Sequence, residues 1–279
     1  LIENIDIGGP SMLRSAAKNH DAVAAVCDPY DYPELLAALD VAGGSTLAER
    51  RKWALKVYAR TSAYDGAIAQ RLALKVEQEM GTEAEPCVKA GLGQVMALVA
   101  ARTSSLRYGE NPHQLAAVYT TPGESLNLAA AEPLQGKELS YNNLLDADAA
   151  LFTLRCLTEG DKSPAAAIIK HNTPCGAARG VSVIEAWRRA LAGDPVSAFG
   201  GIAAFSHPID GETAMAMAEV FLEVIVAPGF TPEARATFAK QGALRLLEIE
   251  DLATAPLPRL SMRSIAGGLL VQEHDRATI

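Results

Sequence analysis

The sequence lacks a long apolar run, a dense block of basic residues and any paired spacing of cysteines. No apolar stretch approaches the ~18 residues that a membrane-spanning helix requires, so we expect no membrane partner. The net charge of -8, from 25 basic and 33 acidic residues, argues against electrostatic binding of nucleic acid. The cysteines are isolated, as in a reduced cytoplasmic protein: Cys27, Cys87, Cys156 and Cys175.

The opening segment LIENIDIGGP contains acidic residues, and it lacks both an initiator methionine and the basic flank of a secretory signal peptide. We therefore expect a cytoplasmic protein, and we expect this chain to be a fragment of a longer one. A net acidic chain of this kind can still hold an anionic small molecule through a few local cations.

The order of apolar and polar segments in residues 1–80 predicts an α/β arrangement. A glycine turn opens a helix over 5–20, an apolar run over 21–27 fits a buried strand, and a helix covers 31–40. Thr46 and Glu49 have the spacing of a capping box, so a long helix is expected from there to about Gln78. This alternation of strand and helix predicts a parallel layer.

Residues 81–105 are first polar and then rich in alanine and valine, which indicates a connecting segment before a second domain over 106–279. That second part again alternates between strand and helix patterns. The strands are expected within 106–120 and over 164–170, 200–206, 224–229 and 244–249; the helices are expected within 136–157 and over 181–193, 210–223 and 231–242.

The stretch AAAIIKHNTPCG (165–176) ends an apolar strand with two adjacent ionisable side chains, Lys170 and His171. Adjacent side chains of a regular strand point to opposite faces, so both can serve one site only if the strand becomes irregular there. The Thr173-Pro174 pair favours such irregularity. Loops at strand ends are common ligand sites in α/β sheets, although a solvated strand end is the simpler interpretation.

The same stretch invites comparison with the zinc site of nucleobase deaminases, which uses H-x-E and P-C-x-x-C. Here Pro174-Cys175 is not followed by a second cysteine at the required spacing, and residue 173 is threonine where a glutamate is needed. We therefore expect no zinc at this position.

Other polar loops offer binding groups, and each has a purely structural interpretation as well. Arg107 in RYGENPHQ could bind a phosphate or carboxylate, or could belong to a capped surface turn. Asn142 and Asn143 could bind a ligand or cap a helix. Phe199 precedes two glycines, where a ring can stack on a planar ligand or simply fill the core.

The segment DIGG (6–9) directs backbone N–H groups at the start of a helix, which is favourable for an anion. Lys18 lies at the other end of that helix. A cation is common at a helix C-terminus because of the macrodipole alone, so spacing by itself gives Lys18 a structural role.

Taken together, these segments resemble the bifunctional purine-biosynthesis family that combines a formyltransferase, acting on 5-aminoimidazole-4-carboxamide ribonucleotide (AICAR), with an IMP cyclohydrolase. The motifs that carry the resemblance are IDIGGPSMLRSAAKNH, RYGENPHQ, LQGKELSYNNLLDADAA, IIKHNTPCG and DPVSAFGGIAAF. The resemblance covers essentially the whole chain. Complete members are longer at both ends, which implies that this chain is inactive in isolation.

The resemblance implies a fold for each part. Residues 1–80 would be the C-terminal part of a Rossmann-like three-layer cyclohydrolase domain. Residues 106–279 would be the first of two cytidine-deaminase-like α/β units of the formyltransferase domain, without zinc. The family is homodimeric, and its formyltransferase sites are completed across the subunit interface.

The resemblance also implies the chemistry. The family transfers a formyl group from the co-substrate 10-formyltetrahydrofolate to the 5-amine of AICAR, giving FAICAR, and then closes FAICAR to IMP without an essential metal. His171 matches the histidine that removes the amine proton, and a neutral imidazole suits that role at physiological pH. Lys170 matches the lysine that stabilises the oxyanion or protonates the departing folate nitrogen.

Further residues are carried over by motif as nucleotide contacts: Arg107, Tyr108, Asn143, Phe199, Gly200 and Glu223. In the cyclohydrolase part, Lys18 matches a proton-shuttling lysine, and Asp6 with Ile7 lies in a nucleotide-contacting loop. The alternative hypothesis is a truncated chain that acts only as a nucleotide-binding or assembly module.

Overall fold

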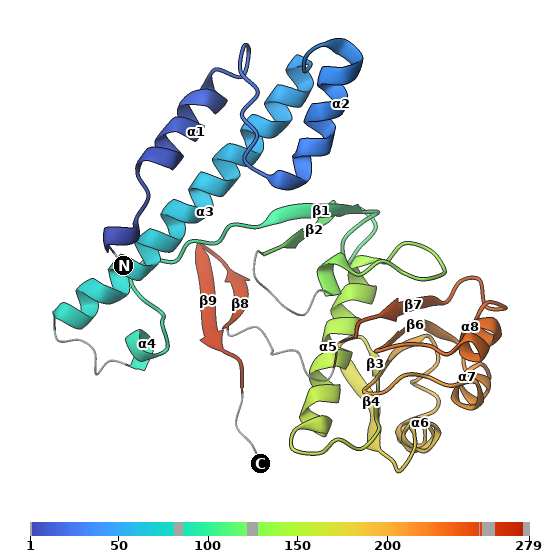
Figure 1. The fold of residues 1–279 in the computed structure, drawn as a ribbon. Coiled ribbons are helices and arrows are strands. Elements are labelled where there is room, and N and C mark those ends of the chain that lie inside the picture. Colours follow the sequence, from blue (N-terminus) through green and yellow to red (C-terminus); the bar gives the residue numbers. More distant parts are fainter. Residues whose placement is uncertain (1, 81–85, 122–127, 251, 253–259, 276–279) are drawn as a thin grey trace. The chain divides into compact units, whose positions relative to one another are not determined.

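The computed structural model is drawn in Figure 1. It describes residues 2–80, 86–121, 128–250, 252 and 260–275. The chain divides into two compact units between Ala100 and Ala101. Within the described residues, no helix has both the length and the apolar character that crossing a bilayer requires.

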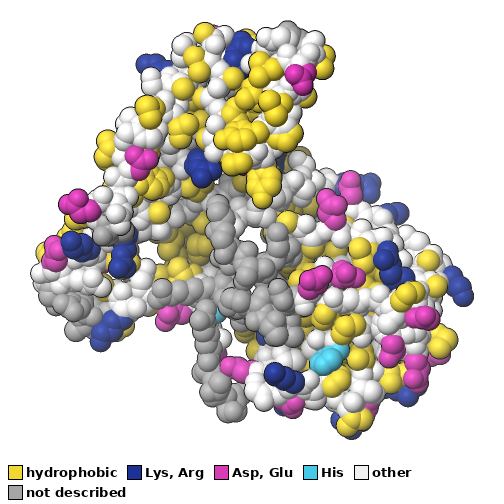
Figure 2. Space-filling model, viewed as in Figure 1, with side chains coloured by type: hydrophobic (Ala, Val, Ile, Leu, Met, Phe, Trp, Pro, Cys, Tyr) yellow, Lys and Arg dark blue, Asp and Glu magenta, His cyan; other side chains and the backbone are white. Residues whose placement is uncertain are grey.

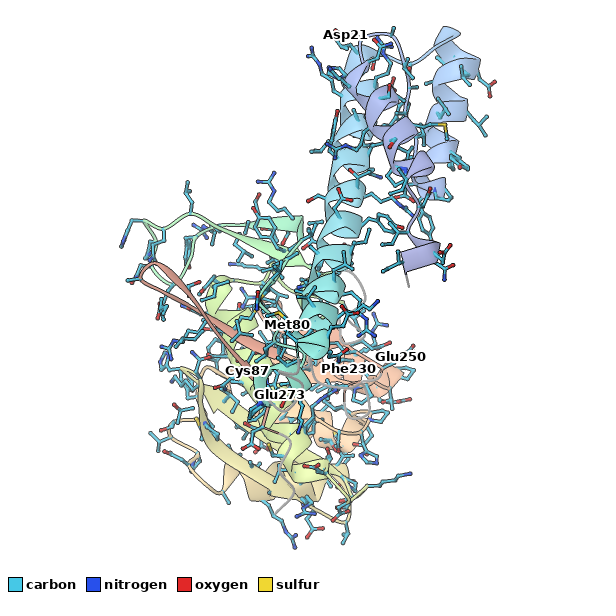
Figure 3. The ribbon with its side chains drawn as sticks, turned by 90° about the vertical axis from the view of Figure 1, so that its left-hand side faces the viewer. Asp21, Met80, Cys87, Phe230, Glu250 and Glu273 are labelled. Carbon is cyan, nitrogen blue, oxygen red and sulfur yellow. The ribbon has the colours of Figure 1, made fainter. Side chains whose placement is uncertain are left out.

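The first unit contains helices and no strand among its described residues. Its longest helix, α3 (Leu47–Glu79), begins at the capping box that the sequence predicts, because the side chains of Thr46 and Glu49 accept each other's backbone N–H groups. Figure 3 shows α3 running from the level of Asp21 to Met80. The other helices are η1 (Ile2–Asn4), α1 (Gly8–Lys18), η2 (Pro29–Asp31), α2 (Tyr32–Ala42) and α4 (Pro86–Lys89).

The strand predicted over 21–27 is wrong, and so is the parallel layer predicted for this part of the chain. A strand needs a neighbour for its backbone groups, and the described residues of this unit supply none. Side chains of α3 bond the carbonyl oxygens instead. Arg50 donates to the carbonyls of His20 and Asp21 at 2.8 and 2.9 Å, and Arg60 donates to that of Cys27 at 3.2 Å.

A small core holds the helices of this unit together. Trp53 and Val57 of α3 are fully buried, and Val57 packs with Ala17 of α1. Lys56 of α3 donates to Asp31 at 2.6 Å, and this hydrogen bond raises the pKa of Lys56. The same helices also expose many apolar side chains, which appear as yellow areas over their surface in Figure 2.

The second unit is built on a mixed five-stranded sheet of order β4-β3-β5-β6-β7. Strand β3 pairs antiparallel with β4 and β5, whereas β5, β6 and β7 are parallel. The predicted α/β class is therefore confirmed for this unit. The strands are β3 (Ala165–Lys170), β4 (Thr173–Arg179), β5 (Gly201–Phe205), β6 (Leu222–Ala227) and β7 (Arg245–Glu248).

Alternation along the strands gives the sheet two buried faces. Ala165, Ala167 and Ile169 of β3 face the helix α5 (Tyr141–Thr158). Ala166 and Ile168 face the opposite layer, which Figure 1 shows as three short helices. These helices are α6 (Val183–Leu191), α7 (Gly211–Met217) and α8 (Pro232–Phe238).

The starts of two predicted helices coincide with capping residues. Asp210 caps α7 and Thr231 caps α8, each through its side-chain oxygen. The helix predicted over 210–223 is too long, because α7 ends at Met217. The next strand, β6, begins at Leu222, where pairing with β5 buries its apolar side chains.

Two antiparallel hairpins complete the second unit. Strand β1 covers the last residues of the predicted connecting segment and pairs with β2. Strand β8 pairs with β9. A short 3-10 helix, η3, follows β2 in the described chain. Their bounds are β1 (Ala101–Leu106), β2 (Ala116–Thr120), η3 (Leu128–Ala130), β8 (Leu260–Ile265) and β9 (Gly268–Glu273).

Close packing of α6 on the edge strand β4 depends on Gly176. A β-carbon at this position would overlap the carbonyl oxygen of Ala190 in α6, and neither backbone can move independently. We predict that Gly176→Ala lowers the free energy of unfolding by at least about 2 kcal/mol. Gly242→Ala is the control, since a β-carbon there meets no atom within 4 Å. Urea unfolding of both variants measures the difference, and equal stabilities would contradict the predicted packing.

Candidate active site

The predicted site residues of the second unit lie at one edge of the sheet. Lys170 ends β3, Phe199 and Gly200 immediately precede β5, and Glu223 is the second residue of β6. Because β3 is antiparallel to β5, its carboxyl end lies beside the amino ends of the parallel strands. In most parallel sheets ligands bind at the carboxyl ends, so this site would occupy the opposite edge.

Lys170 and His171 lie where β3 turns into β4. The connecting loop has two residues, His171 and Asn172, with φ angles of 54° and 59°. Two left-handed residues form the tight hairpin turn that matches strand twist, and asparagine tolerates this conformation well. The pairing of β3 with β4 also shifts register between Ile168 and Ile169. The strand therefore loses regular geometry at this point, as the sequence predicts.

The ammonium group of Lys170 is held beside the loop before β5. Its Nζ donates to the carbonyl oxygen of Phe199 at 2.6 Å. Gly200 has a φ of 75°, and its N–H donates to the carbonyl of Phe221 at 2.7 Å. The Phe199 ring contacts that of Phe221 with centroids 5.2 Å apart, yet its side chain remains 61% exposed. An aromatic face is thus available beside the Lys170 cation.

Asn143 links the start of α5 to the start of β6. Its Oδ1 accepts from the backbone of Ser140, completing a capping box at the helix start. Its Nδ2 donates to Oε2 of Glu223 at 2.8 Å. Both interpretations of this asparagine, helix cap and site residue, are therefore compatible, because different atoms of one buried amide serve the two contacts.

Arg107 and Tyr108 line a cavity of about 370 Å³. The Arg107 guanidinium lies 5.8 Å from the centre of the Tyr108 ring. Arg245, the first residue of β7, lines the same cavity and approaches Oε2 of Glu223 at 3.9 Å. The described residues that line it are Arg107, Tyr108, Lys137, Glu138, Leu139, Ser140 and Arg245. Three basic side chains against one acidic side chain favour an anionic group such as a phosphate.

Sequence reasoning missed Arg245. Its Nε donates to the carbonyl oxygens of Lys137 and Glu138 at 3.3 Å each, which fixes the guanidinium at the cavity wall. The available signal was a single basic residue in the mostly apolar strand pattern LRLLEI. That signal does not reveal the partners, because they lie more than a hundred residues earlier in the chain.

The contacts join the predicted residues of this unit into two groups. One comprises Lys170, Phe199 and Gly200, with His171 next in the chain. The other comprises Asn143 and Glu223, which reach the cavity of Arg107 and Tyr108 through Arg245. The first turns of α5 touch both groups, since Asp146 accepts hydrogen bonds from the His171-Asn172 loop.

Asp6, Ile7 and Lys18 belong to the first unit and lie at opposite ends of α1. An eleven-residue helix spans ~16 Å, so the structure does not bring Lys18 to the Asp6-Ile7 loop. The N–H of Gly9 donates to Oδ1 of Asp6 at 3.0 Å. One of the backbone groups expected to face an anion is therefore used within the loop. The side chain of Lys18 is exposed at the helix C-terminus.

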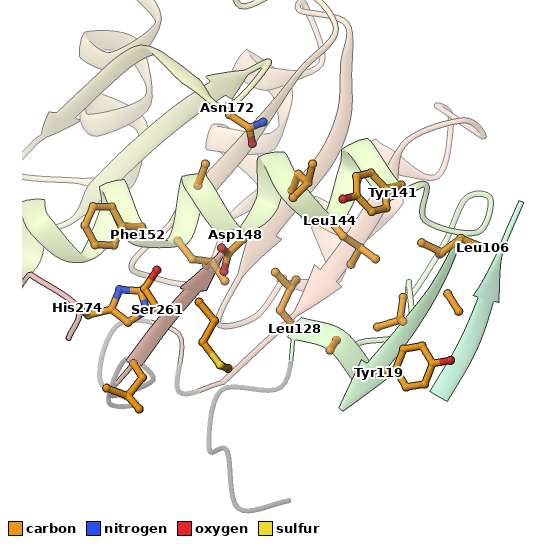
Figure 4. Close-up of a pocket in the computed structure, with 18 residues that line it drawn as sticks. Leu106, Tyr119, Leu128, Tyr141, Leu144, Asp148, Phe152, Asn172, Ser261 and His274 are labelled. Carbon is orange, nitrogen blue, oxygen red and sulfur yellow. The ribbon is translucent and has the colours of Figure 1, made fainter. Parts of the chain in front are cut away.

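A larger cavity of about 790 Å³ lies on the other side of α5, and its lining as described includes no predicted site residue. Tyr141, Asp148 and Phe152 of α5 face it, together with His274 and the loop residue Asn172 (Figure 4). Burial raises the pKa of Asp148, and the nearby His274 opposes that rise. Tyr141 and Asp148 lie within the segment LQGKELSYNNLLDADAA, but nothing in that segment predicts this cavity.

A family model described as the AICARFT/IMPCHase bienzyme matches residues 16–279. This chain belongs to that bienzyme family. A bifunctional purine biosynthesis protein PurH from Rhodospirillum rubrum is 49% identical over 279 residues, and one from Roseobacter denitrificans is 48% identical over 276 residues. These alignments cover 100% and 99% of this chain but 50% of each relative, so the chain spans about half the length of these bienzymes.

Among solved structures, a putative formate dehydrogenase accessory protein from Desulfotalea psychrophila aligns with a TM-score of 0.28 at 9% identity. The alignment covers 31% of this bienzyme-family chain and 43% of the other chain. Similarity at this level does not establish a shared fold. The assignment of this chain to the family therefore rests on sequence similarity.

The pKa of the Cys175 thiol in β4 responds to the charged side chains around the β3–β4 hairpin. Desolvation raises the pKa of its thiol, Asp194 and Asp146 raise it further, and the Lys170 cation lowers it. Among the described residues, no three histidine, cysteine or acidic side chains are grouped as metal ligands.

We predict that Cys175 alkylates with half-maximal rate at a higher pH than a free cysteine, because only the thiolate reacts. Lys170→Ala removes the stabilising cation, so the midpoint rises further and alkylation at pH 8.5 slows. Lys162→Ala, at the other end of β3, is the matched control. Mass spectrometry of iodoacetamide labelling follows the reaction, and an identical midpoint in both variants would contradict the predicted proximity of Lys170.

Proposed function

We propose that this chain belongs to an enzyme of de novo purine biosynthesis that formylates AICAR to FAICAR and then cyclises FAICAR to IMP. The formyl donor is 10-formyltetrahydrofolate. The observation that carries the proposal is the 49% identity, over the whole chain, to a bifunctional purine biosynthesis protein. The site geometry supports it, because Lys170 and the anion-binding cavity lie at one edge of the sheet.

The nucleotide is held by groups that suit its parts. Arg107 and Arg245 face one cavity and bind the phosphate, and Tyr108 offers a ring to the same nucleotide. Asn143 and Glu223 form a hydrogen-bonded pair that supplies both a donor and an acceptor. Phe199 accepts the Lys170 hydrogen bond through its carbonyl group, and its exposed ring can stack on a planar ligand.

Formyl transfer requires proton removal, because the 5-amine of AICAR is a weak nucleophile whose lone pair is drawn into the ring. His171 accepts that proton as the amine nitrogen bonds to the formyl carbon. Lys170 stabilises the resulting oxyanion, and the bond from the formyl carbon to the folate nitrogen breaks as that nitrogen takes a proton. The ammonium has three donors, and Phe199 occupies one, which leaves two for the reaction.

Ring closure is assigned to the first unit. The carboxamide nitrogen of FAICAR attacks the formyl carbon, and water leaves. Lys18 shuttles the proton, and the Asp6-Ile7 loop contacts the nucleotide. Because α1 separates these groups, this site needs a nucleotide that reaches along the helix or residues outside the described chain. Neither reaction requires a metal.

The finer fold and assembly belong to the same proposal. Residues 1–80 are the C-terminal part of a Rossmann-like cyclohydrolase domain, to which the described residues contribute helices. Residues 81–105 connect it to a cytidine-deaminase-like unit over 106–279, without zinc. The enzyme acts in the cytoplasm as a homodimer.

Separate substitutions distinguish the two activities in a full-length protein that carries this chain. His171→Ala removes the base, so we predict a loss of formyl transfer of about 10²- to 10⁴-fold with FAICAR cyclisation unchanged. Lys18→Ala gives the reverse pattern. His207→Ala, at the opposite edge of the sheet, is the control. Rates are measured with AICAR plus formyl donor, and with FAICAR alone.

AICAR binding to the His171→Ala variant is measured by calorimetry, and we expect it to be retained. Unchanged formyl transfer in that variant would contradict the base assignment. Absence of both activities from the unsubstituted protein would leave only the binding-module hypothesis.

A further inference from the structure

The loop that carries His171 is held by a carboxylate from a different element. Asp146 of α5 accepts the N–H of Asn172 at Oδ1, at 2.7 Å, and that of His171 at Oδ2, at 3.3 Å. Each carboxylate oxygen therefore takes one of the two N–H groups of the loop. Asp146 lies within the segment LQGKELSYNNLLDADAA, 25 residues before His171, but nothing in that segment predicts this contact.

The geometry of the loop explains why such a partner matters. His171 and Asn172 both have left-handed backbone conformations, which residues other than glycine adopt at a cost. In a two-residue hairpin loop, both N–H groups point away from the strand ladder and need acceptors elsewhere. A carboxylate that accepts both N–H groups stabilises this conformation relative to alternative turns.

The imidazole of His171 depends on the loop for its position. Its side chain is exposed, and within the described part of the chain its ring has no hydrogen-bond partner. The hydroxyl group of Thr173 donates to the backbone carbonyl oxygen of His171 at 3.4 Å, and not to the ring. The backbone therefore sets where this side chain begins and in which direction it leaves the loop, and Asp146 holds the backbone.

The same carboxylate lies three residues after Asn143, one turn further along α5. Asn143 bonds Glu223 beside the anion cavity, whereas Asp146 bonds the hairpin loop. One helical turn thus sets the spacing between the nucleotide groups and the proposed base.

We propose that Asp146 is a positioning residue for formyl transfer, which holds the His171-Asn172 turn in the conformation that presents the imidazole and the Lys170 ammonium to one substrate. The inference rests on the function proposed above. Asp146 acts through the backbone of the loop and does not touch the reacting atoms.

The test uses Asp146→Ala and Asp146→Asn in a full-length protein that carries this chain. Alanine removes both acceptors, whereas asparagine keeps one carbonyl oxygen. We predict that kcat for formyl transfer falls roughly tenfold to a hundredfold with alanine and less with asparagine, while KM for AICAR changes less than about twofold. FAICAR cyclisation, which is assigned to the first unit, stays unchanged, and the nearly unchanged KM for AICAR shows that the second unit is folded.

Asp161→Asn is the matched control, because Asp161 accepts the N–H of Ser163 at 2.8 Å in the loop at the other end of β3. Asn172→Gly added to Asp146→Ala is the rescue variant. Glycine adopts the left-handed conformation without support, so kcat should recover in part. No recovery together with an increased KM would assign Asp146 to substrate binding and overturn the inference.

Hydrogen–deuterium exchange gives a readout that does not depend on activity. The amides of His171 and Asn172 should exchange at least about tenfold faster in Asp146→Ala and unchanged in Asp161→Asn. Unchanged exchange in Asp146→Ala overturns the positioning role, whatever the rates. If exchange responds but His171→Ala retains full formyl transfer, the turn is held as inferred and the proposed function fails instead.

Discussion

The antiparallel pairing of β3 with β5 determines which candidate residues of the second unit lie at the same edge of the sheet. Residues Ala166 to Ile169 pair with Phe205 to Ile202, so the end of β3 lies beside the start of β5. Were β3 parallel to β5, Lys170 and His171 would lie at the opposite edge from Phe199 and Glu223. Because β3 is reversed, the cation, the imidazole and the nucleotide-binding candidates share one edge of the sheet.

The first turns of α5 connect these groups with very few residues. Ser140 and Asn143 cap the helix, and the other end of the Asn143 amide bonds Glu223. One turn later, Asp146 bonds the hairpin loop. The Asn143 side chain therefore both caps the helix and positions Glu223 in the candidate site. Placement by a helix whose inner face packs on the sheet suits a reaction that depends on positioning and proton transfer.

Local signals in the sequence were reliable where a residue and its neighbours determine the structure. The Thr46-Glu49 capping box is an example. Predictions failed where residues distant in the sequence determine the secondary structure. The apolar run over 21–27 lacks a strand neighbour in the described chain, and the end of the helix predicted over 210–223 is displaced by the buried strand β6.

In the candidate site too, the sequence predicts individual residues but not the contacts that depend on distant partners. The family resemblance identifies candidate site residues in both units, but it does not predict which of them are in contact. Contacts such as that of Asn143 with Glu223 join residues 80 positions apart in the sequence. The sequence around Arg245 and Asp146 does not reveal their partners, since only the fold brings those backbone groups close to each side chain.

The most direct measurement is a crystal structure of the full-length protein with AICAR bound. The account predicts that the phosphate lies between Arg107 and Arg245 and that the 5-amine lies within hydrogen-bonding distance of the His171 ring, with Lys170 beside it. A nucleotide bound in the larger cavity near Asp148, with its amine remote from His171, would contradict the account.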